Sequence, residues 1–172
     1  MLTIIQHTAN QTVSEKMFQL LLLADPNKDA IEQYLPNSII LTASLTKHDN
    51  QQLVGIAVLT ANEKTNSQNV NPNNKIIELK NIAIAEEHQG KGYAKQLINT
   101  AKQYALLDGA THLTIGTGNS SLSQLALYQK CGFRISHVVP DFFKNYPVQI
   151  FENGIRCLDM VMLSCDLTKQ ST

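Results

Sequence analysis

The spacing of apolar and polar residues predicts a chain of short strands and helices in mixed order. Apolar residues at every second position predict strands, and apolar residues three or four positions apart predict helices. The resulting order, β-α-α-β-β-β-α-β-α-β-β, is typical of one twisted sheet with helices on its faces. The predicted strands cover residues 2–6, 39–45, 51–60, 75–85, 111–116, 133–139 and 155–167, and the predicted helices cover residues 13–23, 27–35, 90–107 and 120–130.

Two long connections interrupt this pattern. Residues 61–75 are polar and rich in asparagine, and they predict an exposed hairpin loop. Residues 140–154 are rich in aromatic side chains and predict a second loop. Side chains that accept hydrogen bonds from a helix N-terminus are expected at two positions, with Ser14 capping the first helix and Asn119 capping the last.

The apolar residues of the predicted strand 75–85 change face part-way along it. They occupy odd positions as far as Leu79 and even positions from Ile82 onward. Because side chains alternate strictly along a strand, this change requires one extra residue. We therefore predict a β-bulge near Lys80 and Asn81, which would separate the strand from its neighbour. The alternative is an irregular pattern in a strand that is buried on both faces.

A glycine-rich segment follows this strand and precedes the longest predicted helix. Residues Gln89–Ala94 read Gln-Gly-Lys-Gly-Tyr-Ala. The two glycines allow a tight turn and a close approach of the backbone to a ligand. The helix that follows presents unpaired N–H groups and the positive end of its dipole. This arrangement predicts a binding site for a diphosphate.

Two common nucleotide-binding patterns are missing from the sequence. No G-x-x-x-x-G-K-[ST] phosphate loop occurs in the chain. A dinucleotide fingerprint requires glycine or alanine three residues after the second glycine, where this chain has Lys95. The sequence therefore disfavours an enzyme that acts on nucleotide phosphates.

Composition narrows the class of protein further. The 172 residues are expected to form a single domain, 1–172, with a sizeable core. Fourteen basic residues balance fourteen acidic ones, which gives no support for nucleic acid or a membrane surface as a partner. No apolar run approaches the ~18 residues of a membrane span. Five unclustered histidines and three widely spaced cysteines predict no metal site and a reduced, cytoplasmic protein.

The glycine-rich segment also fits the pattern Gln/Arg-x-x-Gly-x-Gly/Ala. It resembles the acetyl-CoA signature of the GNAT family of N-acetyltransferases, and the order of predicted elements resembles that family over nearly the whole chain. Residues 141–160 resemble an uncharacterised bacterial branch. The resemblance implies an α/β (α+β) fold with a twisted mixed sheet of about seven strands and four helices. It also implies acetyl-CoA as cosubstrate and direct acetyl transfer to a primary amine of a small molecule or peptide.

The same resemblance implies which residues hold acetyl-CoA. The main chain of Ile82, Ala83 and Ile84 would pair with the pantetheine arm as an additional strand does. A main-chain N–H near Ala83 or Ile84 would polarise the thioester carbonyl. The residues around the diphosphate would be Gln89, Gly90, Lys91, Gly92, Tyr93, Ala94 and Lys95.

The acceptor amine must lose a proton before it reacts, and Glu78 is the candidate base. A lysine-like amine has a pKa of about 10.4, so at pH 7 only about one molecule in 10³ is neutral. A nearby carboxylate that accepts the proton would accelerate the reaction. Glu78 lies eleven positions before Gln89, where the histone-modifying branch of the family keeps its base. The alternatives are a chain of water molecules and an edge glutamate without a catalytic role.

The CoA thiolate must gain a proton after the transfer, and Tyr128 is the candidate proton donor. The Leu-Tyr…Gly-Phe pattern of the family is present here and ends at Gly132 and Phe133, which implies that Tyr128 is the general acid. A core tyrosine is the alternative, because Tyr128 also lies at helical spacing from Leu125.

An asparagine of the family contacts pantetheine at the start of the same helix. Many members have seven residues from this asparagine to the tyrosine, whereas Asn119 lies nine residues before Tyr128. The resemblance therefore leaves open whether Asn119 or Ser121 makes this contact.

The acceptor is expected to bind between the loops at residues 24–36 and 140–154. The aromatic and acidic side chains of the second loop suit a cationic amine, a homodimer contact or simple packing equally well. The sequence does not select the amine. A non-catalytic acyl-CoA-binding or sensing module on the same fold is the alternative to an enzyme.

Overall fold

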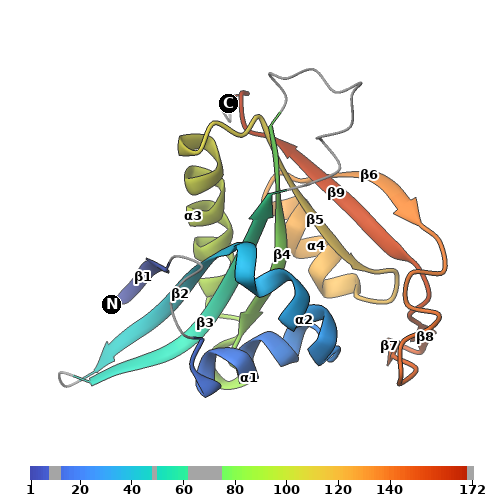
Figure 1. Ribbon diagram of the computed structural model, residues 1–172, viewed down its shortest axis with the longest axis horizontal. Coiled ribbons are helices and arrows are strands. Elements are labelled where there is room, and N and C mark those ends of the chain that lie inside the picture. The colour runs from blue at the N-terminus through green and yellow to red at the C-terminus, as the bar shows by residue number, and fades with distance from the viewer. Residues whose placement is uncertain (8–12, 48–49, 62–74, 170–172) are drawn as a thin grey trace.

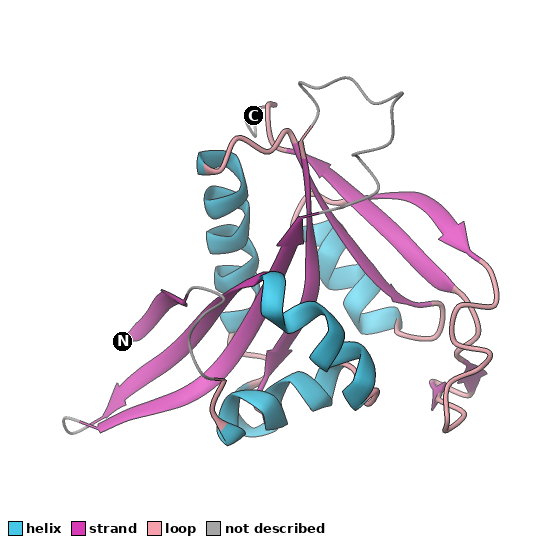
Figure 2. Cartoon of the chain, in the orientation of Figure 1, coloured by secondary structure: helices cyan, strands magenta, loops and turns pink. Residues whose placement is uncertain are grey.

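The computed structural model describes residues 1–7, 13–47, 50–61 and 75–169 of the chain. Over these residues a seven-stranded mixed sheet carries four α-helices (Figures 1 and 2). Across the sheet the strands are β1 (Leu2–His7), β2 (Ser38–Lys47), β3 (Asn50–Ala61), β4 (Ile76–Ile84), β5 (His112–Gly118), β9 (Met160–Asp166) and β6 (Arg134–Val139). The helices are α1 (Glu15–Ala24), α2 (Lys28–Tyr34), α3 (Tyr93–Leu107) and α4 (Leu122–Lys130). A separate hairpin joins β7 (Phe151–Glu152) to β8 (Ile155–Arg156).

The sheet separates two layers of helices, one on each face (Figure 1). Helices α3 and α4 lie over the larger core, which includes Leu79 and Phe133. Helices α1 and α2 lie over the smaller core on the opposite face, which includes Ile31 and Ala83. Strand β4 contributes side chains to both cores, so it is held from both sides.

The change of face along β4 occurs where the sequence predicts it. Val58 of β3 lies opposite Asn81, and the next residue, Leu59, lies opposite Leu79. Lys80 is therefore the extra residue, and the β-bulge predicted near Lys80 and Asn81 is confirmed.

Helix boundaries follow local backbone chemistry. The predicted cap of α1 is confirmed, because the Ser14 hydroxyl accepts a hydrogen bond from the main-chain N–H of Met17 at 3.3 Å. Helix α3 begins at Tyr93 and not at residue 90. Gly90 and Gly92 have φ angles of 73° and 78°, which belong to the left-handed region and not to an α-helix.

The predicted cap of α4 is wrong. The N-cap residue is Ser121, and no side chain bonds to the first turn of α4. The side chain of Asn119 instead bonds to the main chain of the segment before β9.

The last predicted strand, 155–167, is wrong in its first part. Ile155 and Arg156 belong to the hairpin with β7, and β9 begins only at Met160. The hairpin was missed because each of its strands has two residues, too few to show an alternation. The predicted loop at 61–75 connects the antiparallel neighbours β3 and β4, and residues 62–74 of it lie outside the described part of the chain.

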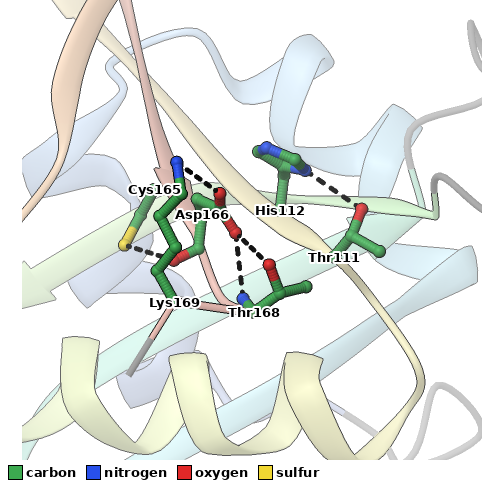
Figure 3. Close-up of polar contacts among 6 residues, drawn as sticks. All are labelled: Thr111, His112, Cys165, Asp166, Thr168 and Lys169. Atoms are coloured by element: carbon green, nitrogen blue, oxygen red, sulfur yellow. Dashed lines mark hydrogen bonds and ion pairs between the residues drawn. The ribbon is translucent and has the colours of Figure 1, made fainter. Parts of the chain in front are cut away.

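A compact turn ends β9 beside the start of β5 (Figure 3). The Asp166 carboxylate accepts hydrogen bonds from the hydroxyl and the main-chain N–H of Thr168, at 2.7 and 3.0 Å, and lies 3.1 Å from Lys169 Nζ. These hydrogen bonds lower the pKa of the Asp166 carboxyl below its usual value. In the neighbouring strand, the Thr111 hydroxyl and His112 Nδ1 are 3.0 Å apart.

A buried asparagine connects two helices to the bulged strand. Asn81 is 5% exposed, and its Nδ2 donates to the Leu21 carbonyl of α1 at 3.1 Å and to the Tyr34 hydroxyl of α2 at 3.0 Å. Because the amide is buried, water cannot replace these bonds freely. Asn81 therefore fixes the position of α1 and α2 relative to β4.

Replacing Asn81 by alanine is expected to lower the free energy of unfolding by about 1–3 kcal/mol, because buried hydrogen-bond partners are left unpaired. Urea denaturation followed by circular dichroism measures this change. Asn99→Ala, at an exposed position of α3, is the matched control and should change stability by no more than about 0.5 kcal/mol. Equal stability of the two variants would contradict the structural role of Asn81.

Candidate active site

The bulge at Lys80 opens the sheet between β4 and β5. The two strands pair in parallel from Ile76 opposite His112 to Leu79 opposite Ile115. Beyond these positions, within the described residues, β4 pairs only with β3 and β5 pairs only with β9. The two strands diverge visibly in Figure 1.

The hydrogen-bond ladder identifies which main-chain groups of β4 face this opening. The N–H of Ala85 donates to the Val54 carbonyl at 2.9 Å. Bonded and non-bonded pairs alternate in an antiparallel ladder. Ala83 therefore directs its main-chain groups to β3, whereas Ile82 and Ile84 direct theirs toward the opening.

One of these groups already has a partner. The side-chain amide of Gln89 donates to the Ile84 carbonyl at 3.0 Å. The N–H and C=O of Ile82 and the N–H of Ile84 remain as an edge to which an extended ligand can bind. The side chain of Ile84 is buried, and that of Ile82 packs against the larger core.

A cleft of about 1250 Å³ begins at this opening and runs between the two layers of helices. Its walls come from the second halves of β4 and β5, the first turn of α3 and the inner side of α4. At the far end they come from the α1–α2 turn and residues 142–152. The residues that contribute to the walls include Asp25, Tyr34, Glu78, Asn81, Ile82, Ala83, Ile84, Gln89, Gly90, Gly92, Tyr93, Ala94, Lys95, Ser121, Tyr128, Phe142, Phe143, Tyr146 and Glu152.

The glycine-rich segment directs the start of α3 at the cleft. The left-handed φ angles of Gly90 and Gly92 suit glycine because it has no Cβ. The first helical bond runs from Gln96 N to the Gly92 carbonyl at 3.2 Å, and no side chain caps this end. The N–H groups of residues 93–95 are therefore without a helical partner, as an anion site requires.

The two lysines of this segment differ in position. Lys95 is exposed and contributes to the cleft wall. The amine of Lys91 donates to the Glu87 carbonyl at 2.8 Å, and Lys91 is not part of the wall. The geometry therefore favours Lys95 over Lys91 as a partner for a diphosphate.

The two candidates at the start of α4 also differ. Both polar atoms of the Asn119 side chain bond to the main chain of residues 156–159, at 2.8 to 3.1 Å, and Asn119 is not part of the wall. Ser121 is part of the wall, and its hydroxyl donates to Glu152 Oε2 at 2.5 Å. The geometry favours Ser121 for a contact with pantetheine.

Two glycines of β5 form the floor beside this contact. A Cβ at Gly116 would lie 2.6 Å from the sulfur of Met160, and a Cβ at Gly118 would lie 2.5 Å from the sulfur of Cys157. A side chain at either position would therefore require these sulfur atoms to move.

Tyr128 projects from α4 into the cleft wall and is 5% exposed. Its ring packs against Phe133, with centroids 6.3 Å apart. Burial, with a smaller effect of Cys131, raises the pKa of the Tyr128 phenol well above its usual value. The phenol therefore keeps its proton at neutral pH.

Glu78 also lines the cleft, two residues before the bulge. Its side chain is 17% exposed, and Oε1 lies 3.1 Å from Lys80 Nζ. The carboxylate is thus held next to an ammonium group in a position that solvent reaches.

The sequence does not single out Tyr34 or Asn81 as cleft residues. Asn81 has a usable signal, because it is a polar residue within an apolar strand. Tyr34 lies within residues 24–36, where the acceptor is expected, but its own place in the cleft depends on how α2 packs.

Comparison with known proteins identifies the family. The model of the Acetyltransferase (GNAT) family matches residues 8–133. The chain is also 45% identical over 158 residues to the uncharacterized N-acetyltransferase YvbK of Bacillus subtilis, which covers 91% of this chain and 93% of the relative. The chain belongs to the GNAT family. It is an N-acetyltransferase by this membership.

Solved structures of family members have the same fold. A GNAT family acetyltransferase from Elizabethkingia anophelis with acetyl-CoA bound is 40% identical, with a TM-score of 0.80 and coverage of 96% of this chain and 97% of that one. A Bacillus subtilis acetyltransferase in complex with CoA is 42% identical, with a TM-score of 0.80 and coverage of 96% and 99%. The predicted mixed sheet of seven strands with four helices is confirmed. None of the helices in the described ranges has the length and apolar character that a membrane crossing needs.

The residues of this cleft fit acetyl-CoA, the ligand of the Elizabethkingia relative. The edge of Ile82 and Ile84 offers main-chain partners for the amides of pantetheine. The uncapped N-terminus of α3 offers N–H groups and a favourable dipole for the diphosphate.

Replacing Gly92 by alanine is expected to weaken CoA binding about 5- to 30-fold. The left-handed backbone costs an L-residue about 1–2 kcal/mol, so the free segment relaxes and binding must restore it. Isothermal titration calorimetry measures the change in Kd.

Gly109→Ala is the matched control, because Gly109 has the same φ of 78° at the other end of α3 and does not contribute to the cleft. Both variants should lose similar stability, but Gly109→Ala should bind CoA as the unmodified protein does. Equal Kd values for all three proteins would refute the diphosphate role of this segment.

Proposed function

We propose that the protein transfers the acetyl group of acetyl-CoA directly to a primary amine, without a covalent enzyme intermediate. The observation that carries the proposal is the separation of β4 from β5 after the bulge. It opens one cleft that contains a free strand edge, an uncapped helix N-terminus, a carboxylate and a buried phenol. Acetyl-CoA supplies the acetyl group as an activated thioester.

Glu78 is the proposed general base. The acceptor reaches the protein mostly as an ammonium ion, and its nitrogen must lose a proton before it can attack a carbonyl. The carboxylate of Glu78 can accept this proton directly or through one water molecule. Its place in the cleft wall supports the assignment, and its contact with Lys80 Nζ at 3.1 Å shows that an alkylammonium group fits beside it.

A main-chain N–H of β4 is proposed to polarise the thioester carbonyl. The ladder favours Ile82 or Ile84 as the donor, since Ala83 bonds to β3. Such a donor is fixed before the reaction begins and costs no reorganisation.

Tyr128 is the proposed general acid. As the new carbon–nitrogen bond forms and the carbon–sulfur bond breaks, the sulfur leaves as a thiolate. The phenol of Tyr128 donates its proton to that sulfur. Its place in the cleft wall supports this role, and the phenol is protonated across the neutral range, as a proton donor must be.

Tyr128→Phe is expected to lower kcat about 10²-fold or more, because it removes the proton donor and keeps the ring. The Kd for CoA should change little. Thiol release in a stopped assay gives kcat, and calorimetry gives Kd. Tyr104→Phe, on α3 and outside the cleft, is the control, and the acid assignment fails if both variants turn over at the normal rate.

Glu78→Gln is expected to raise the pH optimum and to lower activity at pH 7. Without a base, the rate follows the neutral fraction of the amine, which rises about tenfold per pH unit below a pKa of about 10.4. A pH–rate profile with saturating acetyl-CoA measures this change. Glu86→Gln, exposed and outside the cleft, should keep the normal profile; a normal profile for Glu78→Gln would leave a water chain as the base.

A further inference from the structure

The far end of the cleft, beyond Glu78, has its own chemistry. It is formed by Asp25 in the α1–α2 turn, by Tyr34 at the end of α2, and by Phe142, Phe143 and Tyr146 of the long loop. We refer to these five residues as the acceptor pocket.

Asp25 is a partly buried carboxylate without a close counter-charge. Its Oδ1 accepts a hydrogen bond from the N–H of Asn27 at 2.9 Å. No lysine, arginine or histidine of the described ranges lies within ion-pair distance of it. Burial raises the pKa of the Asp25 carboxyl, and the Asn27 bond and the more distant charge of Lys80 only partly oppose this effect. A bound cation would relieve the unfavourable burial of this charge.

Aromatic side chains line the same end of the cleft as the carboxylate. Phe142 and Phe143 are 4.9 Å apart, and Phe143 and Tyr146 are 5.0 Å apart, both with edge-to-face geometry. Burial, and after it the nearby charge of Asp25, raises the pKa of Tyr146 to about 12. Asp25 also raises the pKa of Tyr34, after the larger effect of burial. Both tyrosines therefore lie within electrostatic reach of Asp25, and aromatic rings near a carboxylate suit a cation.

A buried hydrogen-bond acceptor lies beside this pocket. Asn81 lines the cleft, and its Oδ1 has no hydrogen-bond partner among the described residues. Its amide nitrogen is already used by Leu21 and Tyr34. This oxygen is buried, so it adds negative partial charge next to the pocket without contacting solvent.

Asp25 is the carboxylate of this region that a second ammonium group can bind. Carboxylates of Asp25, Glu78 and Glu152 line the cleft, as do the ammonium groups of Lys80 and Lys95. Lys80 lies 3.1 Å from Glu78, and Glu152 accepts hydrogen bonds from two serine hydroxyls. Among the described residues, Asp25 has no ion-pair partner of its own and feels only the more distant charge of Lys80.

We propose that the acceptor is a diamine, whose reacting nitrogen lies at Glu78 and whose second ammonium binds Asp25 and the rings of Tyr34 and Tyr146. This inference rests on the proposed acetyl transfer and names the substrate class of the same site. The second ammonium stays protonated throughout, so Asp25 acts in binding and takes no proton.

Matched pairs of substrates test the proposal. α,ω-Diamines with three to five methylenes are compared with n-alkylamines of equal carbon number, using thiol release from acetyl-CoA. The diamine should show kcat/KM about 10- to 100-fold higher, mainly through a lower KM, because a charge-assisted contact is added. Raising the salt concentration should reduce this preference, since charge attraction is screened.

Variants locate the preference in the structure. Asp25→Asn keeps an oxygen for the Asn27 N–H and removes the charge, so the diamine-to-monoamine ratio of kcat/KM should fall toward one. Tyr146→Leu removes a ring face and should lower the same ratio. Asp29→Asn, exposed on α2 and outside the cleft, should leave the ratio as in the unmodified protein.

The outcomes separate this inference from the proposed function. Equal kcat/KM for diamines and monoamines, or a ratio that persists in both Asp25→Asn and Tyr146→Leu, overturns the diamine assignment while acetyl transfer stands. If no amine is acetylated, the proposed function fails, and calorimetry of 1,4-diaminobutane with the CoA-bound protein still tests the pocket. Binding that Asp25→Asn weakens supports the cation site, and no measurable binding overturns it.

Discussion

One extra residue in β4 determines the rest of the site. Strands β4 and β5 begin as paired neighbours, and the bulge at Lys80 makes continued pairing impossible. The main-chain groups of Ile82 and Ile84 then lack strand partners on one side, which is costly for a buried strand unless a ligand supplies them. The interruption of the sheet therefore leaves unpaired main-chain groups to which an extended molecule can bind.

Main-chain groups of α3 add an attraction for anions to the free strand edge at Ile82 and Ile84. The first turn of α3 is uncapped, so its N–H groups act on anions without a dedicated charged side chain. At the far end of the cleft, burial raises the pKa of the Asp25 carboxyl, so its negative charge is poorly solvated. The fold thus attracts an anion at the start of α3 and a cation at Asp25.

The sequence predicts the features that depend on local chemistry. The alternation of apolar side chains along β4 predicts its change of face. The glycines before α3 predict a turn, although the helix begins at Tyr93, three residues later than predicted. Contacts between segments that are far apart in the sequence cannot be predicted in this way. The sequence could not decide between Asn119 and Ser121, because that choice depends on the path of residues 156–159. It places Tyr34 within residues 24–36 near the acceptor but does not single it out, because only the docking of α2 brings its side chain to the cleft.

The side-chain amide of Asn81 connects strand β4 to helices α1 and α2. The main chain of Asn81 belongs to β4, while its side chain anchors α1 and α2. A change that moves either helix is therefore expected to move the strand edge at Ile82 as well. The α1–α2 turn and residues 142–146 also line the cleft, but the Asn81 bonds do not hold them, so their side chains can be exchanged without shifting β4.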